Sequence, residues 1–495
     1  MSDHRDRAAM RPAQGPTDTS WTSAGSDGAR LLGLVIALAL FAVIVSQVPL
    51  RETDIAVYAK AAERVFTGGE DPYPRRDGNV LPFTYPPTAL PLLWPIAALS
   101  APQLGEVMRA LNLLLTLAVM VIVVGDLARD DPTRRLLFWG PLYIATFGGL
   151  YLNLQFGQIN LLLLLLLWGY WRRLREDRQS PAAGALLALG CIAKPHYALL
   201  ALGAGPRPGL RLIAGGLLGG GLLLALSLWV APSGSWLSWW REIVATTSLT
   251  ELPPGHSSIA APWNRSLAGA VARFLVPNQF SRILADDPAL AAHLSSLAIL
   301  LVLAISAAVL WRSMRRSLRP TASQYQARGP VDRDLELSII AITVFLIAPA
   351  SWTHHLVMLL PAALVLLRER VLAFGVPLSS RLTAGLVLAV LALTLDDLIP
   401  RELRTVSLPL MTLMTVGVLA LWLLLTERLW RRSTRLTPNA HHRHDRILRR
   451  LRSRRATAAR HRPCRLAATD TGPATGDSGR ARGTGPTRLG RDRLR

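Results

Sequence analysis

The stretch LSSLAILLVLAISAAVLWRSMRRSLR, residues 294–319, decides the fold class of this chain. Residues 294–310 contain no charged side chain, and the run approaches the roughly 20 residues that a helix needs to cross a bilayer. It ends directly in a basic cluster, made by Arg312, Arg315, Arg316 and Arg319. An apolar run followed by such a cluster is typical of a membrane span whose basic end lies in the cytoplasm.

The same alternation of apolar runs and arginine clusters continues along all 495 residues. The chain is 51% hydrophobic and has a formal net charge of +23, and the two properties are segregated. A soluble protein of this length would show amphipathic segments, so the pattern argues against a soluble fold. The clusters flank the runs and therefore indicate topology, and no nucleic acid partner is expected. The runs are 32–48, 111–124, 161–168, 212–230, 294–310 and 408–425, and the clusters are 134–135, 172–175, 207–211, 312–319, 368–370 and 428–432.

These clusters predict an all-α polytopic membrane protein of about 12 transmembrane helices, with extracytoplasmic loops, interfacial helices and both chain ends in the cytoplasm. The segment 182–205 decides how many transmembrane helices are predicted. As a single span it would place Arg207 and Arg211 outside and reverse the side of every later cluster. We therefore expect two short segments that meet near the outer surface at Lys194–Pro195–His196, because proline breaks helices.

Three parts are expected along the chain: a disordered cytoplasmic N-terminus at 1–29, a transmembrane domain at 30–430, and a basic, disordered cytoplasmic tail at 431–495. The tail has few large apolar residues, so it cannot bury a core, and its charge favours contact with anionic lipid. The first apolar run lacks a small-residue cleavage site and is expected to be retained. The two cysteines, Cys191 and Cys464, supply neither a disulfide framework nor a metal site.

In this topology the unusual polar residues gather on the outer side of the membrane, whereas the span centres carry no charge. Ion-coupled transporters place ionisable groups at mid-membrane. The distribution therefore favours chemistry at the membrane surface over transport. The outer polar positions are Asp54, 71–87, 155–160, 194–196, 256–266, 352–355 and Asp396–Asp397.

Asp54 begins the amphipathic segment 53–66, which we expect to lie along the membrane interface. Two roles are open for its carboxylate. An acidic residue here caps a helix or interacts with the dipole of the first turn, and the residues alone favour this role. A carboxylate held just above the bilayer is also suited to accept a proton from a substrate hydroxyl.

Aromatic and amide side chains on the same side are suited to sugars. The loop 71–87 carries Tyr73 and Tyr85, whose rings can pack on sugar rings, although aromatic residues are common at any membrane interface. Loop amides can hydrogen-bond a polyol or simply satisfy turns. The candidate amides are Gln158, Asn160 and Asn264.

Lys194 is one of only two lysines in a chain that otherwise uses arginine. Alone it could snorkel to the membrane surface. Beside His196, its ammonium is also suited to bind a lipid phosphate, and His354 and His355 add donors at the same depth. Adjacent histidines seldom bind one metal ion and no acidic partner occurs at ligand spacing, so no zinc site is expected.

Taken together and in order, these pieces resemble glycosyltransferase family 87, the actinobacterial polyprenyl-phosphate-mannose-dependent mannosyltransferases of the GT-C membrane fold. The resemblance runs from about Asp54 to His355. The matching pieces are Asp54 with Tyr58, GEDPY at 69–73, FTYPP at 83–87, GQIN at 157–160, Lys194–Pro195, NRS at 264–266 and WTHH at 352–355.

The resemblance implies an inverting transfer of mannose from a β-linked polyprenyl phosphate to a mannosylated glycolipid or glycan, commonly through an α-(1→2) linkage. The reaction would take place without metal or other cofactor on the extracytoplasmic side of a bacterial plasma membrane.

By the same resemblance, Asp54 would be the general base that deprotonates the acceptor hydroxyl, in place of a capping role. Lys194, His354 and His355 would hold the donor phosphate, and the aromatic and amide residues would hold the sugars. The family motif has glutamine between Asn264 and Ser266, whereas this chain has Arg265, and the role of that position stays open.

Three other functions stay open, one of which is a structural role in a cell-wall complex. Related sequences use a polyprenyl-phosphate-arabinose donor, and no residue in this chain selects hexose over pentose. A lipid-glycan flippase or transporter is the alternative of a different class. It requires a polar path through the span centres, which the pattern does not show.

Overall fold

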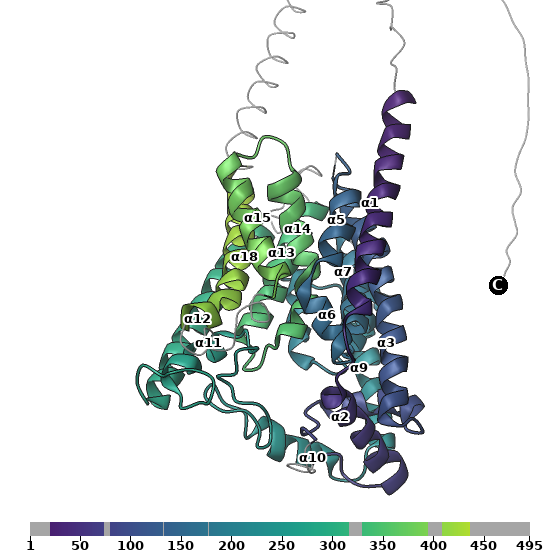
Figure 1. Ribbon diagram of the computed structural model, residues 1–495, viewed down its shortest axis with the longest axis vertical. Coiled ribbons are helices and arrows are strands. Elements are labelled where there is room, and N and C mark those ends of the chain that lie inside the picture. The colour runs from purple at the N-terminus through teal and green to yellow at the C-terminus, as the bar shows by residue number, and fades with distance from the viewer. Residues whose placement is uncertain are drawn as a thin grey trace, which may run out of the picture. The chain divides into compact units, whose positions relative to one another are not determined.

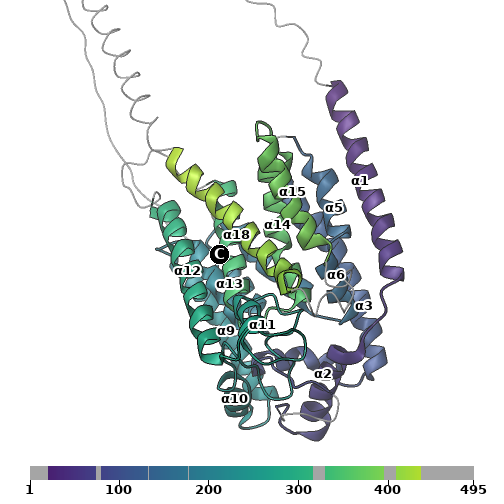
Figure 2. The same cartoon turned by 60° about the vertical axis from the view of Figure 1, so that its left-hand side comes forward.

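The computed structural model describes residues 20–73, 80–131, 133–176, 178–315, 329–394 and 408–435, which form a bundle of helices (Figures 1 and 2). An isolated antiparallel bridge joins Asn264 to Trp352. Of the residues expected to be disordered, 1–29 and 431–495, those at 1–19 and 436–495 lie outside the described ranges, as does Asp396–Asp397, whereas 20–29 and 431–435 are helical. The last described helix runs to Arg435, beyond the predicted domain end at 430.

The first half of the bundle contains α-helices, marked α, and short 3₁₀ or π segments, marked η. In chain order they are α1 (Ser20–Ser46), α2 (Glu52–Glu63), η1 (Arg64–Gly68), η2 (Pro87–Ile96), α3 (Ala101–Ala118), η3 (Val119–Val123), α4 (Val124–Ala128), α5 (Leu136–Ala145), α6 (Gly148–Gln155), α7 (Asn160–Arg175), α8 (Pro181–Gly190) and η4 (Pro195–Ala204).

The second half begins with the long helix that returns against α8. Its elements are α9 (Leu210–Val230), α10 (Ser235–Trp239), η5 (Trp240–Val244), α11 (Leu267–Leu275), α12 (Pro288–Met314), α13 (Pro330–Ile347), η8 (Thr353–Leu359), α14 (Leu360–Leu366), η9 (Leu367–Leu372), α15 (Leu378–Ala392) and α18 (Leu408–Arg435).

Four helices of the described ranges are long and apolar enough to cross a membrane by length and composition. They are Ala101–Ala128, Leu210–Val230, Pro288–Met314 and Leu410–Thr434. Shorter apolar helices accompany them at Leu31–Ser46, Leu136–Ala145, Pro181–Gly190 and Leu378–Ala392. The four long helices and Leu31–Ser46 fall on apolar runs of the sequence, and Pro181–Gly190 falls on the first half of the predicted broken pair. The chain is therefore a helical membrane protein.

The predicted break at Lys194–Pro195 is confirmed. Helix α8 ends at Gly190, and the 3₁₀ helix η4 begins at Pro195 with Lys194 as its N-cap. Lys194 has φ −137° and ψ 76°, which lies outside the helical region. Proline disfavours the α conformation in the residue before it, so the local sequence itself produces this break.

Glycines allow α8 and α9 to pack backbone against backbone. A Cβ atom on Gly215 would lie 1.9 Å from the carbonyl oxygen of Pro181, and one on Gly184 would lie 2.0 Å from that of Leu212. Small residues at such positions let membrane helices approach closely. This contact sets the position of α8 and, with it, the position of Lys194 just beyond its end.

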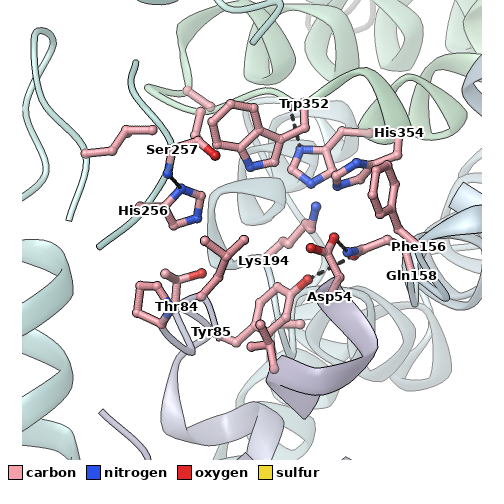
Figure 3. A pocket seen from close by; sticks show the side chains of 18 of the residues that line it. Asp54, Thr84, Tyr85, Phe156, Gln158, Lys194, His256, Ser257, Trp352 and His354 are labelled. Carbon is pink, nitrogen blue, oxygen red and sulfur yellow. Dashed lines mark hydrogen bonds between the residues drawn. The ribbon is translucent and has the colours of Figure 1, made fainter. Parts of the chain in front are cut away.

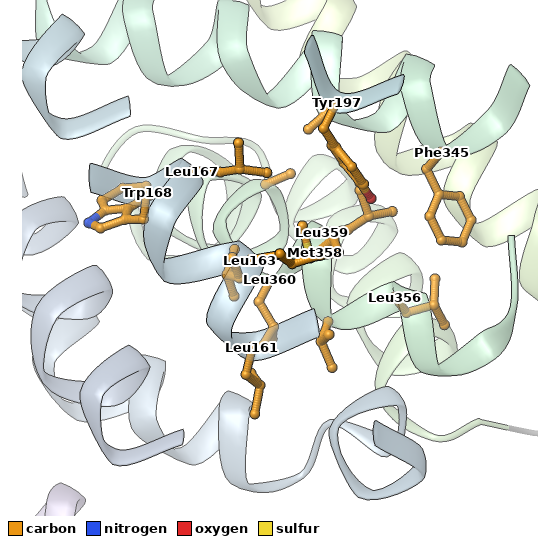
Figure 4. Packing of buried hydrophobic residues seen from close by; sticks show 14 of the residues in the cluster. Leu161, Leu163, Leu167, Trp168, Tyr197, Phe345, Leu356, Met358, Leu359 and Leu360 are labelled. Carbon is orange, nitrogen blue, oxygen red and sulfur yellow. The ribbon is translucent and has the colours of Figure 1, made fainter. Parts of the chain in front are cut away.

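The largest apolar core runs through the bundle from α1 to α18, and Figure 4 shows the part of it formed by α7, α13 and the segment of η8 and α14. It places the start of η8 beside the turn between α6 and α7, since η8 packs on both helices. The buried residues labelled in Figure 4 are Leu161, Leu163, Leu167, Trp168, Tyr197, Phe345, Leu356, Met358, Leu359 and Leu360.

Buried ion pairs join the helix ends that carry the arginine clusters. Asp334 of α13 is fully buried and pairs with Arg175 of α7 at 2.8 Å and with Arg368 of η9 at 2.9 Å. Arg428 of α18 pairs with Glu369 at 3.0 Å. The sequence predicts these arginines only as markers of topology. The structure shows that several of them also link four segments of the bundle.

The α8–α9 contact predicts that Gly215→Ala lowers the unfolding temperature of the purified protein. An added methyl group must push the two backbones apart, and overpacking of this kind costs about 1–3 kcal/mol. Gly220→Ala is the control on the same helix, because a Cβ there meets no atom within 4 Å. It should leave the temperature unchanged or raise it. Thermal unfolding followed by tryptophan fluorescence measures both, and equal temperatures for the two variants would contradict the packing argument.

Candidate active site

One cavity of about 580 Å³ collects side chains from segments that are far apart in the sequence (Figure 3). Its walls come from α2, the loop before η2, the turn between α6 and α7, the start of η4, the segment 247–263 and the segment 348–355. The sequence-predicted site residues that line it are Asp54, Tyr58, Tyr85, Gln158, Lys194, His196, His354 and His355.

The other predicted site residues lie behind this lining. The Tyr73 hydroxyl donates to the backbone carbonyl of Tyr85 at 2.8 Å, and the Asn160 amide donates to the Asn153 side chain at 3.0 Å. Tyr73 therefore holds the loop that carries Tyr85, and Asn160 holds the turn between α6 and α7.

Asn264 and Arg265 hold two loops together. The Asn264 amide donates to the carbonyl oxygens of Ile259 and Pro349, at 2.9 and 3.0 Å. The fully buried Arg265 donates from Nε to the Thr353 hydroxyl at 3.1 Å. Arg265, the position where the chain departs from the family motif, thus supports the segment that carries His354.

Asp54 is the third residue of α2, whose N-cap is Arg51, and α2 has no capping side-chain hydrogen bond. Its carboxylate instead accepts a hydrogen bond of 2.5 Å from the Gln158 amide. Burial raises the pKa of Asp54 to about 6, against the opposing effects of the Gln158 hydrogen bond and the positive charge of Lys194. A carboxylate with this pKa is a stronger base than an exposed aspartate and is still mostly ionised at pH 7.

The Lys194 side chain points toward Asp54 across the cavity (Figure 3). Lys194 is only 4% exposed, and among the described residues its ammonium has no hydrogen-bond partner. Burial lowers the pKa of Lys194 to about 7, although the negative charge of Asp54 opposes this shift. A buried ammonium without a hydrogen bond is costly, so the site favours an anionic ligand group that supplies one.

Two histidines present hydrogen-bond donors to the same cavity. The Nδ1 atom of His355 accepts from the Trp352 backbone at 3.2 Å, and Nδ1 of His256 accepts from the Ser257 backbone at 2.9 Å. Burial lowers the pKa of His256 to about 4, so its ring is neutral at pH 7. A neutral ring that accepts at Nδ1 carries its proton on Nε2, and each histidine therefore offers an Nε2–H donor.

His256 also stacks on Trp352, with ring centroids 5.4 Å apart and planes 5° apart. Figure 3 shows this pair on the opposite side of the cavity from Gln158. The pair forms a flat surface beside hydrogen-bond donors, which is suited to a sugar ring. Sequence reasoning noted the outer position of both residues but assigned neither a role in the site.

Arg51 and Phe156 also line the cavity without having been predicted. The Arg51 guanidinium lies 5.8 Å from the Phe156 ring centroid, and the Arg51 backbone N–H donates to the Gln155 carbonyl at 2.8 Å. A signal was available in the sequence. Arg51 follows the first span on the predicted outer side, where arginine is less common than on the cytoplasmic side.

Within the described ranges, no group of three or more His, Cys, Asp or Glu side chains is arranged to hold a metal ion. The cavity combines a buried carboxylate, an ammonium, neutral imidazole donors and aromatic faces. A positioned base next to a cation is suited to move a proton from a hydroxyl while an anionic leaving group departs. The site is therefore equipped for group transfer between polar substrates.

Residues 83–327 match the sequence model of glycosyltransferase family 87, and this match includes the loop of Tyr85, the turn of Gln158, and Lys194. The chain is similar to this family over just under half of its length, which supports a glycosyltransferase activity.

Two curated relatives make the comparison more specific. The chain is 29% identical over 380 residues, 72% of this chain and 78% of the relative, to the polyprenol-phosphate-mannose-dependent alpha-(1-2)-phosphatidylinositol mannoside mannosyltransferase of Mycobacterium tuberculosis. It is 27% identical over 372 residues, 70% of this chain and 76% of the relative, to the protein of the same name from Mycolicibacterium smegmatis. No solved structure matches the chain.

The proximity of Lys194 and Asp54 predicts that Lys194→Met raises the pKa of Asp54 above about 6, because a cation that favours the ionised carboxylate is removed. Infrared titration of the purified protein measures it, with the Asp54 carboxyl band identified by its loss in Asp54→Asn. Thr394→Ala, which changes an uncharged residue of the same cavity, should leave the midpoint in place. A midpoint that falls or stays constant in Lys194→Met would contradict the predicted coupling.

Proposed function

We propose that this protein transfers mannose from polyprenyl-phosphate-mannose to a mannosylated lipid acceptor of the phosphatidylinositol mannoside class. The observation that carries the proposal is that the buried Asp54 carboxylate and the buried Lys194 ammonium line one cavity, because this transfer needs a base and a cation for the phosphate. The names of both relatives support the donor and the acceptor.

We assign the chain to the GT-C architecture, with about 12 spans and the cavity on the extracytoplasmic side of the plasma membrane. Helix α1 leads into α2, which lines the cavity, whereas the ion pairs of Asp334 lie at helix ends that carry the arginine clusters 172–175 and 368–370. Exposed apolar residues on α9, among them Leu217, Leu218 and Trp229, are suited to contact lipid.

In the proposed reaction, a hydroxyl oxygen of the acceptor attacks C1 of mannose. The bond between C1 and the phosphate oxygen breaks, and its electron pair leaves with polyprenyl phosphate. Asp54 takes the hydroxyl proton. Attack from the face opposite to the leaving group inverts C1, so a β-linked donor gives an α-linked product. A phosphate is a good leaving group once its charge is balanced, so the enzyme chiefly has to orient the substrates and balance charge.

Lys194 is the group that balances the charge of the departing phosphate, assisted by His354, His355 and His196. The support is its buried ammonium, which lacks a hydrogen bond among the described residues, and the position of these histidines in the lining. The stacked pair of His256 and Trp352 and the aromatic side chains of α2 and its neighbouring loop hold the sugars. Asp54 and Lys194 line the same cavity, so the attacking hydroxyl with its base and the leaving phosphate can occupy opposite faces of the sugar within it.

The proposal predicts that purified protein in lipid transfers labelled mannose from polyprenyl-phosphate-mannose to a phosphatidylinositol mannoside, and that Asp54→Asn loses at least about 100-fold of the rate. The variant keeps the size of the side chain but removes the base. Its unfolding temperature, measured in parallel, separates loss of chemistry from loss of fold. Glu251→Gln is the matched control on the exposed loop and should keep the wild-type rate.

Two outcomes of this assay would contradict the proposal. Transfer from a polyprenyl-phosphate-arabinose donor but not from the mannose donor would make the protein an arabinofuranosyltransferase. Transfer that persists in Asp54→Asn would remove Asp54 from the role of base.

The proposed orientation predicts that a cysteine at exposed Glu251 reacts with a membrane-impermeant maleimide in intact cells. The background carries Cys191→Ala and Cys464→Ser, so that the new thiol is the single target. A cysteine at exposed Arg178, on the predicted cytoplasmic side, is the control and should react only after the cells are permeabilised. The reverse pattern of labelling would invert the topology.

A further inference from the structure

Gln158 is hydrogen-bonded to Asp54 on one side and to two tyrosines on the other (Figure 3). Its Nε2 atom donates to Oδ2 of Asp54 at 2.5 Å. Its Oε1 atom accepts from the hydroxyls of Tyr58 and Tyr85, at 3.0 and 3.2 Å. The amide therefore links α2 to the loop before η2 and to the turn between α6 and α7.

Only one orientation of this amide is compatible with an ionised Asp54. A carboxylate can only accept hydrogen bonds, so Nε2 must face it, and a flipped amide would place two oxygens against each other. Oε1 then faces the tyrosines, and each hydroxyl has one proton to donate. The rings of Tyr58 and Tyr85 are stacked, with centroids 5.9 Å apart and planes at 18°, which brings both hydroxyls to the same oxygen atom.

The backbone of Gln158 is held by a set of buried asparagines. Its N–H donates to the carbonyl of Asn153 at 3.0 Å, and the Asn153 amide lies 3.4 Å from the Gln158 carbonyl. The Asn153 side chain also bonds to Asn112 at 2.9 Å and to Asn160 at 3.0 Å, and all three asparagines are fully buried. These contacts fix the turn 156–159 against α3 and α7.

The same turn is attached to α2. The Arg51 backbone N–H at the start of α2 donates to the carbonyl of Gln155 at 2.8 Å. Gly157 has a φ of +58°, and a Cβ there would lie 2.8 Å from Cγ1 of Ile55, the residue next to Asp54. The turn and α2 are therefore in direct backbone contact, so the separation between Gln158 and Asp54 is set by packing on both sides.

We propose that Gln158 is a positioning residue, which holds Asp54 in its ionised form by occupying Oδ2 and leaves Oδ1 to receive the proton of the acceptor hydroxyl. Among the described residues no side chain donates to Oδ1. This inference rests on the proposed function, in which Asp54 is the base, and it assigns Gln158 to the base rather than to direct binding of a sugar. Tyr58 and Tyr85 affect Asp54 indirectly, because their hydroxyls orient the Gln158 amide.

Two groups lower the pKa of Asp54 and so favour its ionised form. One is the hydrogen bond from Gln158, and the other is the positive charge of the Lys194 ammonium. Lys194 is unchanged in a Gln158 variant, so a shift in the titration of Asp54 reports on the amide. The other charged or titratable side chains that face this part of the cavity are Arg51, Tyr58, Tyr85, His196, His354 and His355.

The test compares Gln158→Met and Gln158→Leu with wild type. Methionine keeps the length of the side chain and leucine shortens it, and neither can donate a hydrogen bond to Asp54. In each variant the pKa of Asp54 should rise by on the order of one pH unit, because a donor to the ionised form is lost. The acidic limb of the rate profile for mannose transfer should move up equally, which lowers transfer at pH 6 about five-fold.

Two independent readouts follow these shifts, the infrared midpoint of the Asp54 carboxyl band and the pH dependence of transfer. Gln103→Leu is the matched control, since Gln103 lies at the exposed start of α3, where its side chain contacts Ser100 and is not part of the cavity wall. It should leave both readouts unchanged. Unfolding temperatures of the four proteins identify any variant that fails to fold, and either Gln158 variant alone suffices for the comparison.

An infrared midpoint that stays at the wild-type value in the folded Gln158 variants overturns the inference, as does a rate that falls equally at every pH. If Asp54→Asn is inactive in the mannose-transfer assay, the proposed function stands and only the proposed role of Gln158 is wrong. If Asp54→Asn retains transfer, the role of Asp54 as the base and the role of Gln158 in positioning it are both wrong. A parallel upward shift of midpoint and acidic limb in the Gln158 variants supports the inference.

Discussion

The attraction between the Asp54 carboxylate and the Lys194 ammonium is the interaction on which the site depends. Either charge buried alone would cost several kcal/mol, so it would be expected to neutralise. Their opposite signs in one cavity offset part of this cost, and their pKa values, about 6 and about 7, leave both partly charged near neutral pH. The fold brings them together from separate segments, α2 and the break between α8 and η4.

Those features of the fold that have a local cause were predictable from the sequence. Apolar runs of bilayer length predict helices because an unpaired backbone group in lipid is costly, and the long apolar helices fall on these runs. The break at Lys194 follows from Pro195 alone. The number of spans and the side of the membrane on which the cavity lies are arguments from charge and stay predictions.

The roles of individual polar side chains were less predictable, because the same residue type serves a cavity or supports a turn according to its packing. Gln158 lines the cavity, whereas Asn160, two positions later, is fully buried against Asn153. Arg265 appeared at a motif position suited to a substrate and is instead buried against the Thr353 hydroxyl. No pattern of spacing distinguishes these cases, since each depends on a partner that is remote in the chain.

The ion pairs around Asp334 have a consequence for how related sequences diverge. Removal of one member leaves a buried charge without its partner, which costs about 3–5 kcal/mol, a large share of the stability of a typical protein. Asp334 is shared by Arg175 and Arg368, so a neutral residue at 334 would remove one ion-pair partner from each arginine and leave Arg175 with Asp130 and Arg368 with Glu369 alone. We therefore expect these positions to change together during evolution, with apolar residues replacing the whole set, while substitutions at single positions are removed by selection.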